Sequence, residues 1–480
     1  MSAIRYWTEQ ALEANRLSHT PNASDQSGAE TGPFLSARAL AMTMLAMHDA
    51  YMGASGGTAF PVLPAPLVAP PVPPAPTVLH PEPAAAAAAY TVLTALYAKP
   101  GQAGRSLNPE LSAAWEQYAA SHEPDRPSIL FGQAVAKIVT AWRAGDDAYR
   151  NATFLPTGLP YDHDEAPREP GQGFAGVAWG GAPAFAVPMQ PFLPPLGAGA
   201  SGPFATSPEY IAEFIEVQDF GEHRSSHRTP DQTEIGTLWA FDGSRRIGTP
   251  PRFYMQVVLA VLDRHAPGLP ANTLLGVLTG VSIAMADAGI QAWFYKYSQA
   301  HMLWRPALGI PRALLGNPIL PDPHWVPLGR PDTNGFGSEQ TPNFPSYPSG
   351  HATFGASAFQ LLRRFLIFND PGLGFDALLD PDVVPFTITS DEYDGVNIDP
   401  VTRQARPRTP RAYDGLWQAI VDNSESRIWL GVHWRMDGIT TVKAGVTTHG
   451  RPATPNDLGK VGGVRLGWDI ANMLAGKQGF

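Results

Sequence analysis

The stretch Phe344-Pro-Ser-Tyr-Pro-Ser-Gly-His351 separates a proline-rich segment from a long apolar one. Its two prolines lack a backbone N–H and favour an extended conformation in the preceding residue, so no helix is expected before Ser349. From His351 onward, apolar residues recur with the period of a helix. Ser349 and Gly350 should therefore lie at a helix N-terminus, where free N–H groups and the positive end of the helix dipole favour an oxyanion. Taken alone, the stretch is better explained by an ordinary helix cap and a satisfied histidine.

Composition predicts a large helical protein. The chain has 480 residues, of which 44% are hydrophobic and 16% are charged, enough for a sizeable core. We expect an all-α fold of packed bundles joined by long proline-rich loops, with an N-terminal half over 1–230 and a C-terminal half over 231–480 that carries the candidate oxyanion site. Cysteine is absent, which excludes disulfides and thiolate metal sites.

Charge and hydropathy limit the partners. The formal net charge of −10 disfavours nucleic acid and anionic membranes as partners of the whole surface. The N-terminus lacks the apolar core of a signal peptide, and the most apolar run, 274–286, is too short to span a membrane. We expect a soluble protein, cytoplasmic or exported by a non-classical route. The sequence specifies neither the compartment nor the oligomeric state.

The periodicity of apolar residues and the positions of helix-breaking glycines and prolines predict the helices and loops. His48 and Asp49, within the first expected helix, should pair with each other in the core. No stretch has the alternation of a strand. Helices are expected over 36–53, opened by Ser36, over 84–98, 111–121, 127–145, 208–219, 233–242 and 251–265, from Ala271 to Pro306, after Gly350, and from Tyr413 through Asp437. Loops are expected over 56–83, 146–205, 311–348 and 369–412.

Several cations recur around the opening stretch. Lys296 and Arg305 are expected on the helix before it, and Arg427 and His433 on the helix after it. On that last helix His433 and Asp437 are four residues apart, so the carboxylate can hold one imidazole nitrogen and leave the other as a nucleophile or ligand.

Any one of these cations is most simply explained as a solvated or salt-bridged residue. Buried together they are costly, because the acidic residues nearby are too few to pair them all. A bound multivalent oxyanion explains the set: arginine forks, Lys296, the Ser349 hydroxyl and the Gly350 N–H would hold it.

Three segments resemble the signature of the type 2 phosphatidic acid phosphatase superfamily, which joins phosphatases with vanadium-dependent haloperoxidases. These are Arg305-Pro306, Pro348-Ser-Gly-His351 and Ser426-Arg427-x-x-x-Gly431-x-His433-x-x-x-Asp437. The third matches at every fixed position. The first departs from the pattern, because Lys296 and Arg305 are nine residues apart, a longer spacing than is usual. An insertion between Lys296 and Trp304 is implied.

The resemblance to fungal-type vanadium chloroperoxidases extends over nearly the whole chain, including an N-terminal half that the phosphatases lack. Segments that carry it include Leu35-Ser-Ala-Arg-Ala-Leu40, His48-Asp-Ala-Tyr51, Trp239-Ala-Phe-Asp-Gly243 and Gly248-Thr-Pro-Pro-Arg252. It implies two four-helix bundles, with vanadate in the second and phosphate able to occupy the site in its absence. It also implies hydrogen peroxide and a halide as substrates, with a small organic acceptor where halogenation is directed.

By position, the resemblance implies a role for each site residue. His433 would bind vanadium, and Lys296, Arg305, Ser349, Gly350 and Arg427 would hydrogen-bond the vanadate oxygens. His351, beside the oxyanion, would be the acid–base residue, and Lys296 would also assist catalysis. Asp242 would pair with Arg427, and Asp437 with His433. Trp293 and Phe344 would flank the halide, although ordinary core packing explains these two equally well. An aromatic residue at 344 resembles chloroperoxidases, whereas bromoperoxidases usually carry histidine there.

Two other functions fit the same residues. Phosphate and vanadate are near-isosteres, so the pocket could serve a phosphohydrolase in which His433 attacks phosphorus and His351 protonates the leaving group. The chloroperoxidase-like N-terminal half and the Trp293/Phe344 pair favour the haloperoxidase. A non-enzymatic helical scaffold with a decayed site is the third reading, and the intact third segment argues against it.

Overall fold

The computed structural model describes residues 2–21, 27–60, 78–98, 105–122, 125–198, 206–312, 319–337 and 340–480. These residues are mostly helical, which confirms the all-α expectation. Two short antiparallel pairs were not expected: β1 (Phe386–Ile388) with β2 (Arg411–Tyr413), and β3 (Thr441–Lys443) with β4 (Val446–Thr448). Each strand has three residues, too few for alternation to be recognised in the sequence. Most of the loop expected over 56–83 lies outside the described residues.

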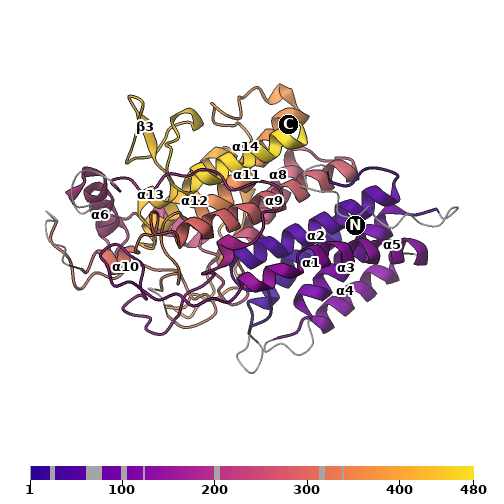
Figure 1. Ribbon diagram of the computed structural model, residues 1–480, viewed down its shortest axis with the longest axis horizontal. Helices are drawn as coiled ribbons and strands as arrows, with labels where there is room; N and C mark the ends of the chain where they lie inside the picture. Colours follow the sequence, from indigo (N-terminus) through magenta and orange to yellow (C-terminus); the bar gives the residue numbers. More distant parts are fainter. Residues whose placement is uncertain are drawn as a thin grey trace.

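The N-terminal helices gather on one side of the molecule, drawn indigo and purple in Figure 1. They are α1 (Ala3–Ser18), α2 (Pro33–Ala54), α3 (Pro81–Tyr97), α4 (Asn108–Ala120) and α5 (Arg126–Trp142). Helices α2, α3 and α5 contact one another, and α1 packs on α3. The alanine run of α3 is buried, and its small side chains let neighbouring helices approach closely. In α2, His48 Nδ1 lies 2.9 Å from Asp49 Oδ1, which confirms their pairing.

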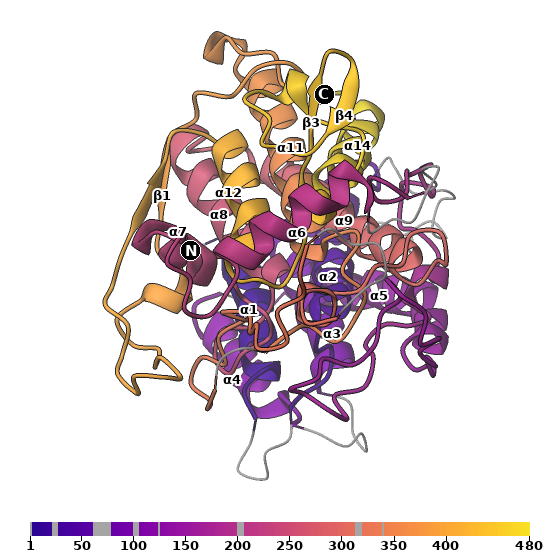
Figure 2. The same cartoon turned by 90° about the vertical axis from the view of Figure 1, so that its left-hand side faces the viewer.

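The second group of helices surrounds α11 (Gly350–Asn369). This helix contacts α8 (Pro250–His265), α9 (Ala271–Lys296), α12 (Leu416–Trp429) and α14 (Gly463–Gln478). Helix α9 also packs against α2, so both groups share one continuous hydrophobic core. Figure 2 shows β3 and β4 as a pair of yellow arrows, and Figure 1 shows that they lie well away from the end of α14 that carries the C-terminus. The finer layout of two four-helix bundles and the division at residue 230 stay predictions.

Four further helices pack on this second group or on one another. They are α6 (Pro208–Phe220), α7 (Pro230–Leu238), α10 (Pro306–Gly309) and α13 (Arg435–Gly438). Among the described helices, α9 alone is long and apolar enough to cross a membrane by length and composition. However, 83% of its most apolar window is buried inside the molecule, as in the core helix of a soluble protein.

Two helices near the site end earlier than the sequence predicts. Helix α9 stops at Lys296 instead of continuing to Pro306, because the following backbone forms turns and the Trp304 N–H donates to the Tyr161 carbonyl at 2.6 Å. Helix α12 stops at Trp429, because Gly431 adopts a positive φ of 69° that ends a helix. His433 and Asp437 therefore do not share the helix that carries Arg427.

Helices α1 and α14 were not predicted, and α2 begins three residues before Ser36, at Pro33. Helix α14 contains two internal glycines, which lower its intrinsic propensity, so packing on α11 must compensate.

A matched pair of glycine substitutions in α14 tests this packing. A Cβ at Gly467 would lie 2.2 Å from the Thr353 carbonyl oxygen of α11, whereas a Cβ at Gly476 would meet nothing within 4 Å. Gly467→Ala should destabilise the protein by about 1–3 kcal/mol through overpacking. Gly476→Ala should stabilise it by up to about 1 kcal/mol through helix propensity. Thermal unfolding would show a lower Tm for the first variant only; equal Tm values would contradict the close contact.

Candidate oxyanion site

The loop 344–348 ends and helix α11 begins at Ser349 and Gly350, as the sequence predicted. Ser349 is the N-cap of α11, and its hydroxyl oxygen accepts from the Ala352 N–H at 3.4 Å. Because the oxygen only accepts in this contact, its hydrogen stays available to a ligand. The Ser349 N–H donates to the Asp437 carbonyl at 2.7 Å, which joins the start of α11 to α13. Gly350, the first residue of the helix, lines a cavity of about 560 Å³.

His433 and Asp437 contact each other through a turn and not across a helix face. His433 Nδ1 lies 2.9 Å from Asp437 Oδ2, and the same oxygen accepts from the Trp434 N–H at 2.9 Å. The sequence therefore predicted the contact correctly and its backbone wrongly. Only glycine fits at position 431 of this turn, since a Cβ added there would lie 2.4 Å from the Gly221 carbonyl oxygen. The close approach of Gly431 is therefore to this backbone.

The proton positions on His433 follow from its neighbours. Arg305 Nη1 lies 3.2 Å from His433 Nε2, and a guanidinium nitrogen can only donate. Nε2 is therefore the acceptor, and Nδ1 carries the hydrogen that is donated to Asp437. Burial, with the nearby charges of Arg305, Lys296 and Arg427, lowers the pKa of His433 well below its ordinary value. The imidazole is neutral, with a lone pair directed toward the cations.

Arg305 reaches the site from a loop. It follows the turns after α9 and is the N-cap of α10, not a residue of the long helix as expected. Its Nε donates to the Phe344 carbonyl at 2.8 Å and its Nη1 to the Val432 carbonyl at 2.7 Å. Nη2 is fully buried and has no partner among the described residues. Burial lowers the pKa of Arg305.

Lys296 has an additional structural role that the sequence did not indicate. Its ammonium nitrogen donates to the carbonyls of Pro345, Ser346 and Pro348 at 2.7, 3.1 and 2.6 Å. These three bonds engage all three ammonium hydrogens. Lys296 therefore holds the loop before α11 in place. Burial and the charge of Arg305 lower its pKa well below the ordinary value.

Arg427 pairs with Asp242 as the resemblance implied. Its Nη2 donates to Asp242 Oδ2 at 2.8 Å, while its Nε and Nη1 are buried without a partner in the part of the chain that is described. Burial alone would raise the pKa of Asp242, but Arg427, His351 and Arg330 more than offset it, so the pKa lies below its usual value. The carboxylate is ionised and balances part of the local positive charge.

His351 is held in a defined tautomer. Its Nε2 lies 2.6 Å from the Ala240 carbonyl oxygen, which can only accept, so Nε2 carries a hydrogen. Asp242 Oδ1 is 3.7 Å from the same nitrogen. Burial and the charge of Arg427 lower the pKa of His351 to about 3. The His351 carbonyl accepts from Tyr254 and Asn423, two residues that the sequence analysis did not single out.

The unpartnered atoms indicate what the site can hold. Arg305 Nη2, Arg427 Nε and Arg427 Nη1 are donors on two guanidiniums of which at most 1% is exposed. A buried donor without an acceptor costs about 1–3 kcal/mol, and more when it is charged. A tetrahedral oxyanion has acceptors on every side and can satisfy all three. The donor set therefore fits a bound vanadate or phosphate, next to His433 Nε2, whose lone pair accepts from Arg305 Nη1.

Aromatic side chains form the next part of the cavity wall. The ring centroids of Trp293 and Phe344 are 4.9 Å apart. Lys296 Nζ lies 5.5 Å from the Trp293 ring and 5.0 Å from the Phe344 ring, and Arg305 lies 4.9 Å from the latter. These contacts are cation–π interactions, which are favourable in a desolvated site. The two aromatic residues of the predicted halide site thus lie together beside the cations.

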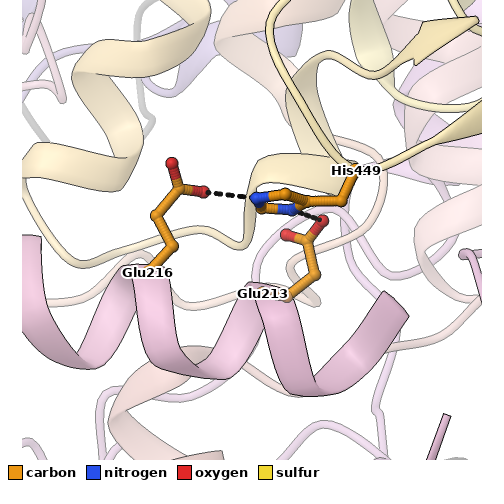
Figure 3. A group of neighbouring side chains, drawn as sticks. All are labelled: Glu213, Glu216 and His449. Carbon is orange, nitrogen blue, oxygen red and sulfur yellow. Dashed lines mark hydrogen bonds and ion pairs between the residues drawn. The ribbon is translucent and has the colours of Figure 1, made fainter. Parts of the chain in front are cut away.

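A second polar cluster supports the turn that carries His433. Figure 3 shows His449 between Glu213 and Glu216 of α6, with His449 Nδ1 2.9 Å from Glu213 Oε1. Within the described residues, it is the one group of three or more His, Cys, Asp or Glu side chains whose ligand atoms lie close enough together to hold a metal ion. Its carboxylates are already engaged: Glu213 accepts from the Met436 N–H at 2.9 Å, and Arg435 donates to both oxygens of Glu216. The cluster therefore joins α6 to α13.

Family models match two long parts of this chain. Residues 2–173 match the vanadium chloroperoxidase N-terminal domain, and residues 276–449 match the VCPO second helical-bundle domain. The vanadium chloroperoxidase of Curvularia inaequalis is 31% identical over an alignment 556 residues long, which covers 98% of this chain and 89% of that protein.

Solved structures share the fold. A bacterial vanadium-dependent iodoperoxidase superposes with a TM-score of 0.70 at 18% identity, covering 99% of this chain and 96% of that one. The apo form of a bacterial vanadium-dependent chloroperoxidase gives 0.59 at 14% identity, over 95% and 96% of the two chains. The domain matches and the identity across nearly the whole sequence confirm the resemblance seen in the motifs: this chain belongs to the vanadium chloroperoxidase family.

Proposed function

We propose that this protein is a vanadium-dependent haloperoxidase that holds vanadate at His433 and oxidises halide with hydrogen peroxide. Family membership makes it an enzyme of peroxide-dependent halide oxidation. The observation that carries the assignment of the site is the set of three unpartnered guanidinium donors next to the lone pair of His433. Vanadate bound there would supply a Lewis acid that makes peroxide more electrophilic without a change in oxidation state.

The surrounding residues would bind the oxyanion, orient His433 or transfer a proton. The two arginines would bind and orient the oxyanion, together with the Ser349 hydroxyl and the Gly350 N–H. Asp437 would hold His433 so that Nε2 faces the oxyanion. His351, neutral and adjacent to Asp242, would accept a proton from incoming peroxide. Lys296 would orient the loop and add positive charge beside the oxyanion.

Peroxide-dependent halogenation of monochlorodimedone tests the function directly. Protein stripped of metal should be inactive and should gain activity with orthovanadate, in chloride or bromide. His433→Ala should remain inactive at the same vanadate concentration, because the lone pair that faces the oxyanion is lost. Hydrolysis of p-nitrophenyl phosphate that vanadate blocks, with no halogenation by either halide, would make the protein a phosphohydrolase instead.

Asp437→Asn tests the orientation of His433. Removing the carboxylate should weaken vanadate binding about 10–100-fold, the usual effect of losing a carboxylate that orients a metal-bound histidine. Equilibrium dialysis against vanadate measures this without turnover. Asp469→Asn, which alters a surface ion pair with Arg465 on α14, is the matched control and should leave the Kd unchanged. An unaltered Kd in Asp437→Asn would refute the orienting role.

His351→Ala should separate chemistry from binding. Loss of the proton acceptor should lower kcat about 10²–10⁴-fold. The vanadate Kd should change much less, because the unpartnered donors belong to Arg305 and Arg427. Steady-state kinetics and dialysis on the same preparation give both numbers. A loss of affinity as large as the loss of kcat would instead make His351 a binding residue.

A further inference from the structure

The cavity at the site is larger than the proposed reaction needs. Its volume is about 560 Å³, within the range of about 300–1,000 Å³ typical of small-molecule pockets. A water molecule occupies about 30 Å³ of the liquid, and peroxide and halide are not many times larger. Space therefore remains for an organic molecule beside the oxyanion.

One wall of the cavity is aromatic. Trp293 packs against Phe34, Phe344 and Phe354, with ring centroids 5.0, 4.9 and 6.1 Å away. All four residues line the cavity; Phe344 is the partly exposed one, and Trp293, Phe354 and Phe34 are buried behind or beside it. Aromatic rings prefer offset or edge-to-face neighbours at such distances, so this wall suits a planar ring better than an aliphatic chain.

Arg330 places a positive charge in the same cavity. It lines the cavity and is partly buried, and its side chain has no hydrogen bond or ion pair within the described ranges. Its backbone is fixed, because its N–H donates to the Gln340 carbonyl at 2.9 Å and the Gly329 N–H donates to the Leu430 carbonyl at 2.7 Å. Asp242, the acidic residue of this wall, has its pKa lowered in part by the charge of Arg330, but its ion pair and hydrogen bond are with Arg427. The planar guanidinium of Arg330 is thus available to form two parallel hydrogen bonds to a carboxylate.

We propose that the cavity binds small aromatic carboxylates as organic acceptors, with Arg330 pairing the carboxylate and the aromatic wall receiving the ring. The inference rests on the proposed haloperoxidase function and names its acceptor. In the overall step the halide is oxidised and peroxide is reduced, each by two electrons. The C–H and O–O bonds break and a carbon–halogen bond forms. The proton lost from carbon and one from solvent join the peroxide oxygens as two waters.

Binding of two matched probes tests the proposal without turnover. 4-Hydroxybenzoate and 4-hydroxybenzamide have nearly the same size, but only the first is an anion. Calorimetric titration into vanadate-loaded protein, without peroxide, should give a Kd at least tenfold lower for the benzoate. Arg330→Met should abolish this difference and leave the Kd of the amide unchanged. Equal Kd values in the wild type, absence of binding, or a preference that survives in Arg330→Met would each overturn the proposal.

Arg264→Met is the matched control. It makes the same change of charge at an exposed position near the end of α8, 14 residues from Pro250, which lines the cavity. Fourteen helical residues span about 21 Å, so this charge lies far from the site. The variant should bind both probes as the wild type does.

Competition between the probes provides a second readout. With bromide, peroxide and equal amounts of both probes, the wild type should favour the brominated benzoate more strongly than reagent hypobromite does. Arg330→Met should return the product ratio to that of the reagent. A higher halide KM in Arg330→Met with an unchanged product ratio would show that Arg330 binds the halide, and it would overturn the proposal. Failure of the haloperoxidase function would appear separately, as no vanadate-dependent bromination at all.

Discussion

Positive charge buried with few carboxylates is the constraint on which the rest of the structure depends. Lys296 and Arg305 have no exposed surface, and Arg427 has 1%. Moving such charges out of water costs several kcal/mol each unless they are compensated. Asp242 and Asp437 supply only part of the compensation. Backbone carbonyls supply much of the remainder, five of them to Lys296 and Arg305 alone.

Four of those five carbonyls, all except that of Val432, are available because the segment before α11 is not helical. A helix uses its carbonyls for its own hydrogen bonds, whereas the prolines of this segment keep the backbone extended and its oxygens free. The two imidazoles then take complementary proton positions. His351 carries hydrogen on Nε2, set by the Ala240 carbonyl, and His433 keeps a lone pair on Nε2, set by Asp437. Both are neutral because burial, together with the cations around them, lowers their pKa values.

Much of this site could be predicted from the sequence, but only where chemistry depends on residue type and short spacing. The N-terminus of α11 and the His433–Asp437 contact follow from local rules. The pairing of Asp242 with Arg427 required a resemblance, because 185 residues separate them. The ends of α9 and α12 could not be predicted, since a tertiary bond to Tyr161 and the positive φ of Gly431 decide them. The free fork of Arg330 could not be predicted either, because no local pattern shows that an arginine lacks a partner.

The cavity wall is shared between the two halves of the chain. His19, Gly32 and Phe34 come from the N-terminal helices and the segment between them, whereas His351 and His433 come from the C-terminal half. One part of the wall that would face an acceptor, which includes Phe34, is thus encoded far from the oxyanion centre, whereas Arg330 and the other aromatic residues lie near that centre in the sequence. Selection could remodel the N-terminal side residue by residue while the oxyanion centre stays intact. In such a lineage, acceptor preference would diverge faster than the reaction itself.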